Sequence, residues 1–302
     1  MDRLQAIEVF TRVVETNSFS KAAELLDLPR GSVSNLVQGL EEHVGVRLLN
    51  RTTRSVSVTD DGALYYERCV RILADLADAD SSLSNKIQNP SGMIRVDTSG
   101  TLARTLLLPM LDDFYRRYPE IEVRLGLADR NIDIVQDGVD CVIRMGALEE
   151  SSLVARRIGN AALTTCASPA YLEEHGTPAT IEDLRAHQAV NYVSARSGKT
   201  FPFEFEVDGE IVKVSLDGPL AVNDGTVYVS AGVRGFGIIQ PSRFMVADLI
   251  GRGELREILT GYRTPTTPLS LVYPHRRNLS SRVRAFTDWV IEIARNHPDL
   301  RT

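Results

Sequence analysis

The sequence contains few cysteines, and those that it has lie far apart. Cys69, Cys141 and Cys166 are an odd number at wide spacing, so they predict neither a disulfide framework nor a zinc site. No apolar run reaches the roughly 18 residues that a membrane-spanning helix needs. The opening residues lack the pattern of a secretory signal peptide, because charges interrupt every apolar stretch. We therefore expect a reducing, cytoplasmic location and no membrane partner.

Positive charge is also scarce. Lysine and arginine total 34 against 40 aspartates and glutamates, which gives a formal net charge of −6. Taken alone, this acidic balance argues against nucleic acid as a partner. The clearly positive stretch is residues 29–59, where arginines outnumber glutamates. Nucleic-acid binding therefore stays open, provided that this stretch carries it.

Length and composition are those of a folded globular protein with more than one domain. Hydrophobic residues make up 43% and charged residues 25% of the 302 positions, which excludes a disordered chain, a collagen and a coiled-coil rod. That length corresponds to roughly two domains at about 100–200 residues each. We predict a first domain over 1–59, a helix with a hinge over 60–90, and a second domain over 91–302.

Three short helical patterns open the first domain. Apolar residues recur at helical spacing over 4–14. Asn17-Ser18 breaks this pattern and is placed to cap a second helix over 19–26. A third helix follows a tight turn and ends at Gly45. The pattern predicts a small unit of crossing helices.

A hairpin and a long helix complete the N-terminal part. Alternating residues over 55–58 predict a strand, and the hairpin tip falls at 51–54. The helix that follows has a heptad seam. Its members are Tyr66, Cys69, Leu73, Leu76, Asp80, Leu83 and Ile87. We expect a helix of a second subunit to cover this seam, with packing on the same chain as the alternative.

The C-terminal part has a different pattern of hydrophobic and polar residues. After a linker at 89–92, strand and helix patterns alternate, which predicts an α/β unit with a parallel sheet. We divide this part into lobe one, comprising 92–164 plus 267–302, and lobe two, comprising 165–266. A lobe inserted in this way needs two crossing strands and leaves a cleft between the lobes.

The third helix and the hairpin carry side chains suited to DNA. The candidates on the helix are Arg30, Ser32, Ser34, Asn35 and Gln38. Asparagine and glutamine pair with adenine in the major groove, which such helices enter. The hairpin candidates are Arg51, Thr53 and Arg54, placed to meet phosphate or a narrow minor groove. Every small helical unit has a polar face, so spacing alone leaves a purely structural interpretation open.

Several runs of residues together carry a family resemblance. They are Ser18-Phe19-Ser20-Lys21-Ala22-Ala23-Glu24-Leu25-Leu26, then Leu40-Glu41-Glu42-His43-Val44-Gly45, then Thr59 with Gly62, Tyr118-Pro119, Ser168-Pro169 and Gly235-Phe236-Gly237-Ile238. Over essentially its whole length the chain resembles the LysR-type transcriptional regulators.

The resemblance implies both the fold and the function. The expected fold is an N-terminal all-α winged helix-turn-helix with a linker helix, then an α/β two-lobed periplasmic-binding-protein-like effector domain. The expected function is transcription regulation at a pseudo-palindromic site on double-stranded DNA, not enzyme catalysis. A dimer through the linker helix and a homotetramer are also implied. Recognition-helix contacts fall on Arg30, Ser34 and Asn35, and the wing contact on Arg54. Many members have arginine where Asn35 stands, which leaves the base preference open.

By the same resemblance, a small-molecule effector binds between the lobes. The best candidates are Ser99, Gly100 and Thr101, at a strand-to-helix turn whose N–H groups suit an anion. A helix cap at Ser99 or Thr101 is a compatible alternative. The further candidates are Asn223, Asp224, Gly225, Val193, Ser194 and Arg144. Arg144 either binds a carboxylate or pairs with Asp140. The effector is expected to be a small carboxylate or an aromatic compound.

No other chemistry has a matching pattern. Gly232, Gly235 and Gly237 precede a strand, which is the reverse of a dinucleotide fingerprint and predicts tight packing. We expect buried, inert thiols, no catalytic residue, no metal and no cofactor. A solute-binding receptor and an enzyme with its active site in the cleft are the alternatives. The DNA-binding head disfavours the receptor, and the lack of a nucleophile–base pair disfavours the enzyme.

Overall fold

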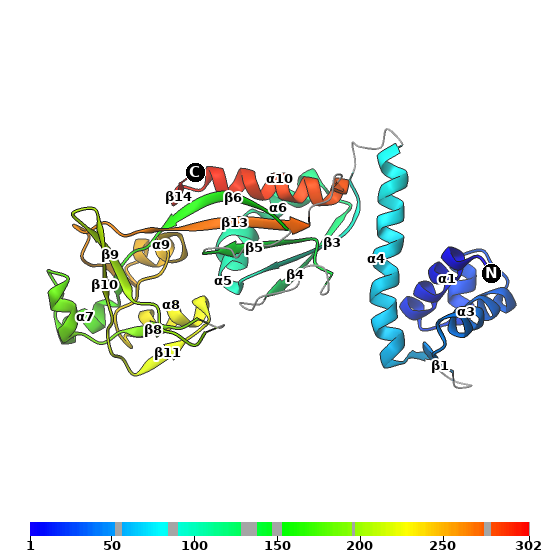
Figure 1. Ribbon diagram of the computed structural model, residues 1–302, viewed down its shortest axis with the longest axis horizontal. Helices are drawn as coiled ribbons and strands as arrows, with labels where there is room; N and C mark the ends of the chain where they lie inside the picture. The colour runs from blue at the N-terminus through cyan, green and yellow to red at the C-terminus, as the bar shows by residue number, and fades with distance from the viewer. Residues whose placement is uncertain are drawn as a thin grey trace. The chain divides into compact units, whose positions relative to one another are not determined.

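The computed structural model describes residues 1–51, 56–83, 90–127, 138–146, 153–194, 197–274 and 279–301. The chain forms two compact units, Met1–Gln88 and Asn89–Thr302, which are coloured from blue to cyan and from green to red in Figure 1.

The first unit, the head, consists of helices and one hairpin. Its elements are α1 (Arg3–Thr16), α2 (Phe19–Leu25), α3 (Arg30–Val44), β1 (Leu49–Arg51), β2 (Val56–Val58) and α4 (Asp60–Leu83). The predicted boundary signals are confirmed. Ser18 Oγ accepts from the Lys21 N–H at 3.3 Å at the start of α2. Gly45 ends α3 with φ 78°, a left-handed conformation that favours glycine.

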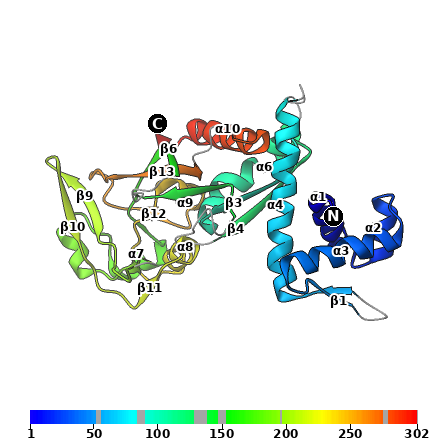
Figure 2. The same cartoon turned by 45° about the vertical axis from the view of Figure 1, so that its right-hand side comes forward.

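One apolar core holds the head together. Phe10 of α1 and Leu40 of α3 are fully buried in it. Ala22 and Ala23 of α2 are also buried, and their small side chains let the helices approach closely. The hairpin pairs Leu49 with Val58 in antiparallel register and lies at the start of α4 (Figure 2). This arrangement is the expected winged helix-turn-helix.

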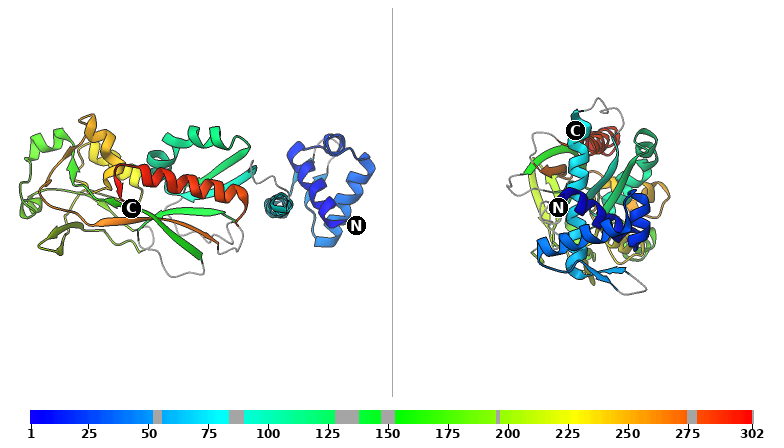
Figure 3. Two further views of the ribbon diagram at one scale, coloured as in Figure 1. Left: turned by 90° about the horizontal axis from the view of Figure 1, so that it is seen from above. Right: turned by 90° about the vertical axis from the view of Figure 1, so that its right-hand side faces the viewer.

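The first half of the predicted seam on α4 packs within the same chain, as in the alternative given for it. Cys69 is fully buried in the head core, and Tyr66 and Leu73 pack against that core. Helix α4, seen end-on in the left view of Figure 3, runs beside α1, which supplies the apolar face. Leu76 remains exposed, as do Leu64 and Ile72 on other positions of α4.

The second unit is built on a six-stranded sheet. Its strands are β3 (Gly92–Thr98), β4 (Ile121–Leu127), β5 (Cys141–Met145), β6 (Leu153–Ala162), β13 (Thr266–Pro274) and β14 (Leu300–Arg301), in the order β14-β6-β13-β5-β3-β4. Helices α5 (Gly100–Leu102), α6 (Leu111–Arg117) and α10 (Ser281–Asn296) accompany it. We call this the sheet lobe. Its core contains Phe114, Phe286 and the single tryptophan, Trp289.

The sheet is mixed, which corrects the expectation of a parallel sheet. Strands β4, β3 and β5 are parallel, whereas β13 runs antiparallel to both β5 and β6. The reason is topological: β6 carries the chain out of the sheet lobe and β13 brings it back alongside. The predicted single helix over 101–118 is also interrupted, by a π-helical turn over Ala103–Leu107 and a 3₁₀ turn over Leu108–Met110 that contains Pro109.

The segment between β6 and β13 forms the inserted lobe. Its strands are β7 (Cys166–Ala167), β8 (Val190–Tyr192), β9 (Phe203–Val207), β10 (Glu210–Val214), β11 (Leu220–Val222) and β12 (Arg256–Glu257), paired as β7 with β12, β8 with β11 and β9 with β10. Its helices are α7 (Pro169–His175), α8 (Gly225–Val233) and α9 (Arg243–Gly251). On α9, Phe244 enters the core of the sheet lobe and Val246 enters that of the inserted lobe.

Candidate functional sites

Helix α3 has a polar side opposite its core side. Its buried residues are Val33, Val37 and Leu40. Among the predicted DNA contacts, Arg30, Asn35 and Gln38 are exposed, while Ser32 and Ser34 are half-buried. Positions 30, 34 and 38 are successive i,i+4 neighbours, so they form one row along the helix. The structure therefore brings Arg30, Ser34 and Gln38 together, with exposed Asn35 beside them, whereas Ser32 lies off this row.

A neighbouring acid orients Gln38. The Gln38 side-chain Nε2 donates to Glu42 Oε1 at 3.0 Å, one turn further along α3. Its amide oxygen and second N–H then remain for a base edge, the combination that suits adenine. The predicted hairpin contacts are placed only in part. Arg51 is the last residue of β1, whereas Thr53 and Arg54 lie outside the described residues.

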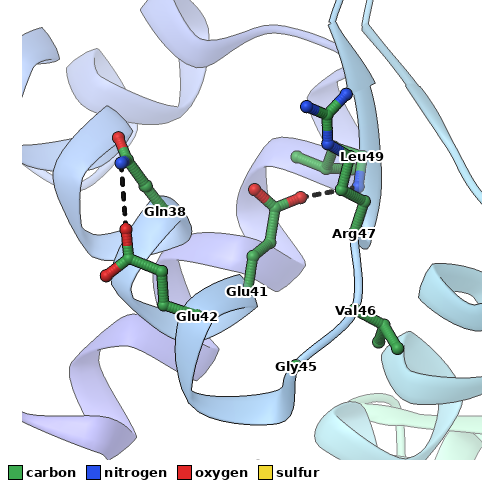
Figure 4. Close-up of a pocket in the computed structure, with 7 residues that line it drawn as sticks. All are labelled: Gln38, Glu41, Glu42, Gly45, Val46, Arg47 and Leu49. Atoms are coloured by element: carbon green, nitrogen blue, oxygen red, sulfur yellow. Dashed lines mark hydrogen bonds between the residues drawn. The ribbon is translucent and has the colours of Figure 1, made fainter.

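The hairpin is joined to α3 beside a hollow of about 590 Å³ (Figure 4). The hollow is lined by Gln38, Glu41, Glu42, Gly45, Val46, Arg47 and Leu49. Within it, Glu41 Oε1 accepts from the backbone N–H groups of Leu48 at 2.9 Å and Leu49 at 3.0 Å. A carboxylate on α3 thus holds the first strand of the hairpin. Glu41 falls in one of the runs that carry the family resemblance, but no signal in the sequence indicates this contact.

In the second unit, two strand-to-helix turns meet. Ser99 caps α5 by accepting from the Leu102 N–H at 3.2 Å, and Asp224 caps α8 by accepting from the Val227 N–H at 2.8 Å. Thr101, on α5 and 1% exposed, lies 3.1 Å from Thr226 of α8, hydroxyl to hydroxyl. The capping alternative at Ser99 is therefore correct. Thr226, the partner, was missed by the sequence analysis, although its hydroxyl follows directly after Gly225.

Glycines shape the space around this contact. A Cβ added to Gly225 would lie 2.6 Å from the Thr101 hydroxyl oxygen, which is too close for a Cβ atom and a non-bonded oxygen. A Cβ added to Gly100 would meet nothing within 4 Å. The first turns of α5 and α8 are therefore in direct contact at Gly225, with open space beside Gly100.

The other predicted effector residues lie around the second turn. The Val193 N–H donates to the Val222 carbonyl at 2.8 Å, which places the end of β8 beside the start of the 223–225 turn. Ser194 Oγ accepts from the Ser197 N–H at 3.2 Å. The Tyr192 hydroxyl, not among the predicted residues, donates to the Asn223 carbonyl at 3.3 Å. Asn223 is exposed and Asp224 half-buried.

Arg144 has a different ion-pair partner from the one expected. Its Nη2 lies 2.6 Å from Asp97 Oδ1, and the two side chains are 19% and 5% exposed. Asp140 instead accepts, through Oδ2, from the Arg95 backbone N–H at 2.9 Å. Asp97 ends up beside Arg144 because β3 and β5 are parallel neighbours, with Asp97 opposite Val142. A carboxylate ligand would have to compete with Asp97 for this guanidinium.

The cysteines are buried, as predicted. Burial raises the pKa of the Cys166 thiol to about 12, and it also raises the pKa of Cys141. The pKa of Cys69 is also raised, chiefly by burial. Across the described part of the chain, no group of three metal-ligating side chains comes together and no helix is long and apolar enough to cross a membrane. The predicted tight packing of the glycines holds at Gly232, where a Cβ would lie 2.4 Å from the Ile239 side chain.

Two family models match this chain. The model described as "Bacterial regulatory helix-turn-helix protein, lysR family" matches residues 4–63, and the "LysR substrate binding domain" matches residues 88–295. Among curated proteins, the HTH-type transcriptional regulator YhjC of Escherichia coli is 40% identical over 99% of this chain and 100% of its own length. An HTH-type transcriptional repressor of Pseudomonas aeruginosa is 37% identical over 100% and 95%, respectively.

Solved structures agree with these matches. CrgA of Neisseria meningitidis, a LysR-type transcriptional regulator, has a TM-score of 0.61 and 34% identity, covering 95% of this chain and 97% of its own. The full-length virulence activator AphB of Vibrio cholerae has a TM-score of 0.57 and 27% identity, covering 96% and 98%. The head and the second unit described above are therefore both similar to parts of known regulators.

Proposed function

This chain belongs to the LysR family of transcriptional regulators, and we propose that it is a one-component switch that reads a pseudo-palindromic DNA site and responds to a small effector. Members of the family and the similar proteins are transcriptional regulators, not enzymes. Each chain then combines a DNA-binding head with an effector-binding unit, and we expect it to act in the cytoplasm, where its DNA is.

The polar row of α3 is the observation that supports DNA binding by the head. Arg30, Ser34 and Gln38 share that row, and exposed Asn35 lies next to it. In the proposal, α3 enters the major groove, where asparagine and glutamine side chains read adenine. Arg51, Thr53 and Arg54 of the wing meet the DNA backbone beside the groove.

Arg54 provides the test of the wing contact. Each phosphate contact contributes about 0.9 to the slope of log K against log salt concentration. Replacing Arg54 with alanine should therefore weaken binding to the DNA upstream of the protein's own gene and flatten this slope, by fluorescence anisotropy. An unchanged slope would remove the wing from the phosphate contacts. No specific binding at all, with stabilisation by a metabolite, would favour a solute receptor.

The effector half rests on the contact between α5 and α8. A ligand beside Gly100 would touch Ser99 and Thr101 of the sheet lobe and the 223–226 turn of the inserted lobe. Because such a ligand interacts differently with closed and open lobes, it shifts the balance between them. Asp97 already engages Arg144, so the ligand's polar contacts fall mainly on hydroxyl and backbone N–H groups of the two turns.

A thermal-shift screen tests this placement. Small carboxylates, phenolics and quinones are screened against the wild type and Thr101→Val, which removes the hydroxyl that lies against Thr226. Thr105→Val is the matched control, because the Thr105 hydroxyl, on the π-helical turn that follows α5, donates to the Thr101 carbonyl. A ligand of this site should lose stabilising power with the first variant and keep it with the second. Ligands unaffected by Thr101→Val would show that the effector binds elsewhere.

Dimerisation through α4 is also part of the proposal. Leu64, Ile72 and Leu76 are large exposed side chains separated by multiples of four residues, so they follow one row of the helix. A second copy covering this row would present two heads to a two-fold DNA site, and pairs of dimers would form the tetramer. Ile72→Glu should lower the mass of the assembly in sedimentation measurements. An unchanged mass would remove this row from the dimer interface.

A further inference from the structure

We propose that Glu41 is a positioning residue for DNA binding, which sets the wing against the recognition helix so that both reach the duplex together. The inference rests on the proposed contact between the wing and DNA. Glu41 is not itself placed against DNA. It acts through the hairpin, and four observations in the head support the role.

The first observation is the pair of hydrogen bonds from a single carboxylate oxygen. Glu41 Oε1 accepts from both the Leu48 and the Leu49 N–H groups, at 2.9 and 3.0 Å. Such bonds to an ionised acceptor are stronger than neutral ones. Leu48 and Leu49 are 1% and 2% exposed, so removing the acceptor leaves two donors with little access to water. The two bonds fix the start of β1 at the fourth turn of α3, and Figure 4 shows the bond that involves Leu49.

The second and third observations concern contacts between α4 and the residues before the strand. Thr59 Oγ1 lies 2.8 Å from the Arg47 carbonyl and also accepts from the Gly62 N–H at 2.9 Å. A Cβ added to Gly62 would lie 2.0 Å from the Leu48 carbonyl oxygen, so the first turn of α4 lies directly against this backbone. The start of β1 is therefore held by contacts from both α3 and α4.

The fourth observation is the position of the anchor relative to the proposed DNA contacts. Glu41 lies three residues after Gln38 on α3, and it holds Leu49, which is two residues before Arg51. Both proposed contact surfaces thus originate within a few residues of this carboxylate. Without it, the hairpin pivots on the α4 side alone, and the spacing between helix and wing is no longer set.

A double-variant cycle in the full chain tests the proposal. Glu41→Met removes both acceptor contacts at similar length, and Glu41→Gln removes the charge but keeps an oxygen that can accept both N–H groups. Each is combined with Arg54→Ala. The probe is a duplex that the wild type selects from a random pool, and the measurements are Kd and its salt dependence. Circular dichroism shows whether each variant is folded.

If Glu41 acts through the wing, Glu41→Met weakens binding about tenfold or more and flattens the salt slope as Arg54→Ala does. Adding Arg54→Ala to it then costs little more, because the wing contact is already lost. Glu41→Gln weakens binding less than Glu41→Met does, since it keeps both bonds, although neutral bonds have about half the strength of charge-assisted ones. A merely structural residue would lower the melting temperature without changing the slope.

Two results overturn the proposal, and they are distinguishable. Additive losses in the Glu41→Met, Arg54→Ala double variant would show that Glu41 does not act through the wing. No effect of Arg54→Ala in the wild type would remove the wing contact itself, and the role of Glu41 with it. If Glu41→Met does not fold, Glu41→Asp takes its place in the same cycle, because the shorter carboxylate cannot reach both N–H groups from the same backbone position.

Discussion

Gly225→Ala is the substitution that tests most sharply whether the two lobes touch. The added Cβ would lie 2.6 Å from the Thr101 hydroxyl oxygen and 3.4 Å from its Cβ. To reach an ordinary van der Waals distance, the new Cβ and the Thr101 hydroxyl oxygen must move apart by roughly 0.8 Å. Thr101 is 1% exposed and β-branched, so its side chain has little freedom to turn away. The first turns of α5 and α8 must therefore separate.

Two opposing effects determine how much free energy of unfolding Gly225→Ala loses. Overpacking of this kind costs about 1–3 kcal/mol. Replacing glycine with alanine returns about 0.4–1 kcal/mol by restricting the unfolded chain. We expect a net loss of about 1–2 kcal/mol in the free energy of unfolding. Thr101→Ala alone loses one hydroxyl contact, at about 0.5–1.5 kcal/mol.

The two substitutions should compensate each other. Thr101→Ala removes the atom that clashes and leaves only a 3.4 Å contact, so the double variant should be no less stable than Thr101→Ala alone. Urea unfolding followed by the fluorescence of Trp289, the single tryptophan and 2% exposed, reports on this unit. A Gly225→Ala variant as stable as the wild type, or additive losses in the double variant, would show that α5 and α8 do not meet in solution.

Three further outcomes follow from the packing and the titrating groups. Gly62→Ala should unfold or displace the hairpin, because its Cβ would meet the Leu48 backbone oxygen at 2.0 Å; native-like melting of the variant would contradict this. The three thiols should stay unreactive toward a disulfide reagent until the chain unfolds, since all are buried; rapid native labelling would contradict their placement. Burial, with the nearby His175 charge, lowers the pKa of His187, against a smaller opposing effect of Asp183. The stability that neutral His187 contributes is therefore complete above its unfolded-state pKa, near 6.5. This stability is lost as the pH falls through the lower folded-state pKa of His187. Unfolding of the second unit should accordingly depend less on pH in His187→Gln, and an equal dependence would refute the assignment.

Local signals in the sequence predicted the element boundaries well. Ser18 and Ser99 cap helices, and Gly45 ends a helix in a left-handed conformation. Each acts on neighbouring residues only, so the nearby sequence is enough to predict these helix ends. The polar row on α3 was predictable for the same reason, because helical periodicity alone assigns its two sides.

Long-range pairing was not predictable. For Arg144 the sequence suggested a ligand carboxylate or Asp140, four residues away, whereas the structure pairs it with Asp97 on a parallel neighbouring strand. The heptad seam identified the apolar positions of α4, but periodicity cannot say whether α1 of the same chain or a second subunit covers Cys69. The direction of β13 likewise depends on the return of the chain from the inserted lobe.

Selection of duplexes from a random pool by the full chain tests the central claim most directly. We expect enrichment of a pseudo-palindrome whose half-sites are separated by about one helical turn. Asn35→Ala should relax base preference at matching positions of both half-sites, because in the proposed function each head places α3 in a major groove. A pool without enrichment, or an unchanged preference with Asn35→Ala, would contradict DNA reading by this helix.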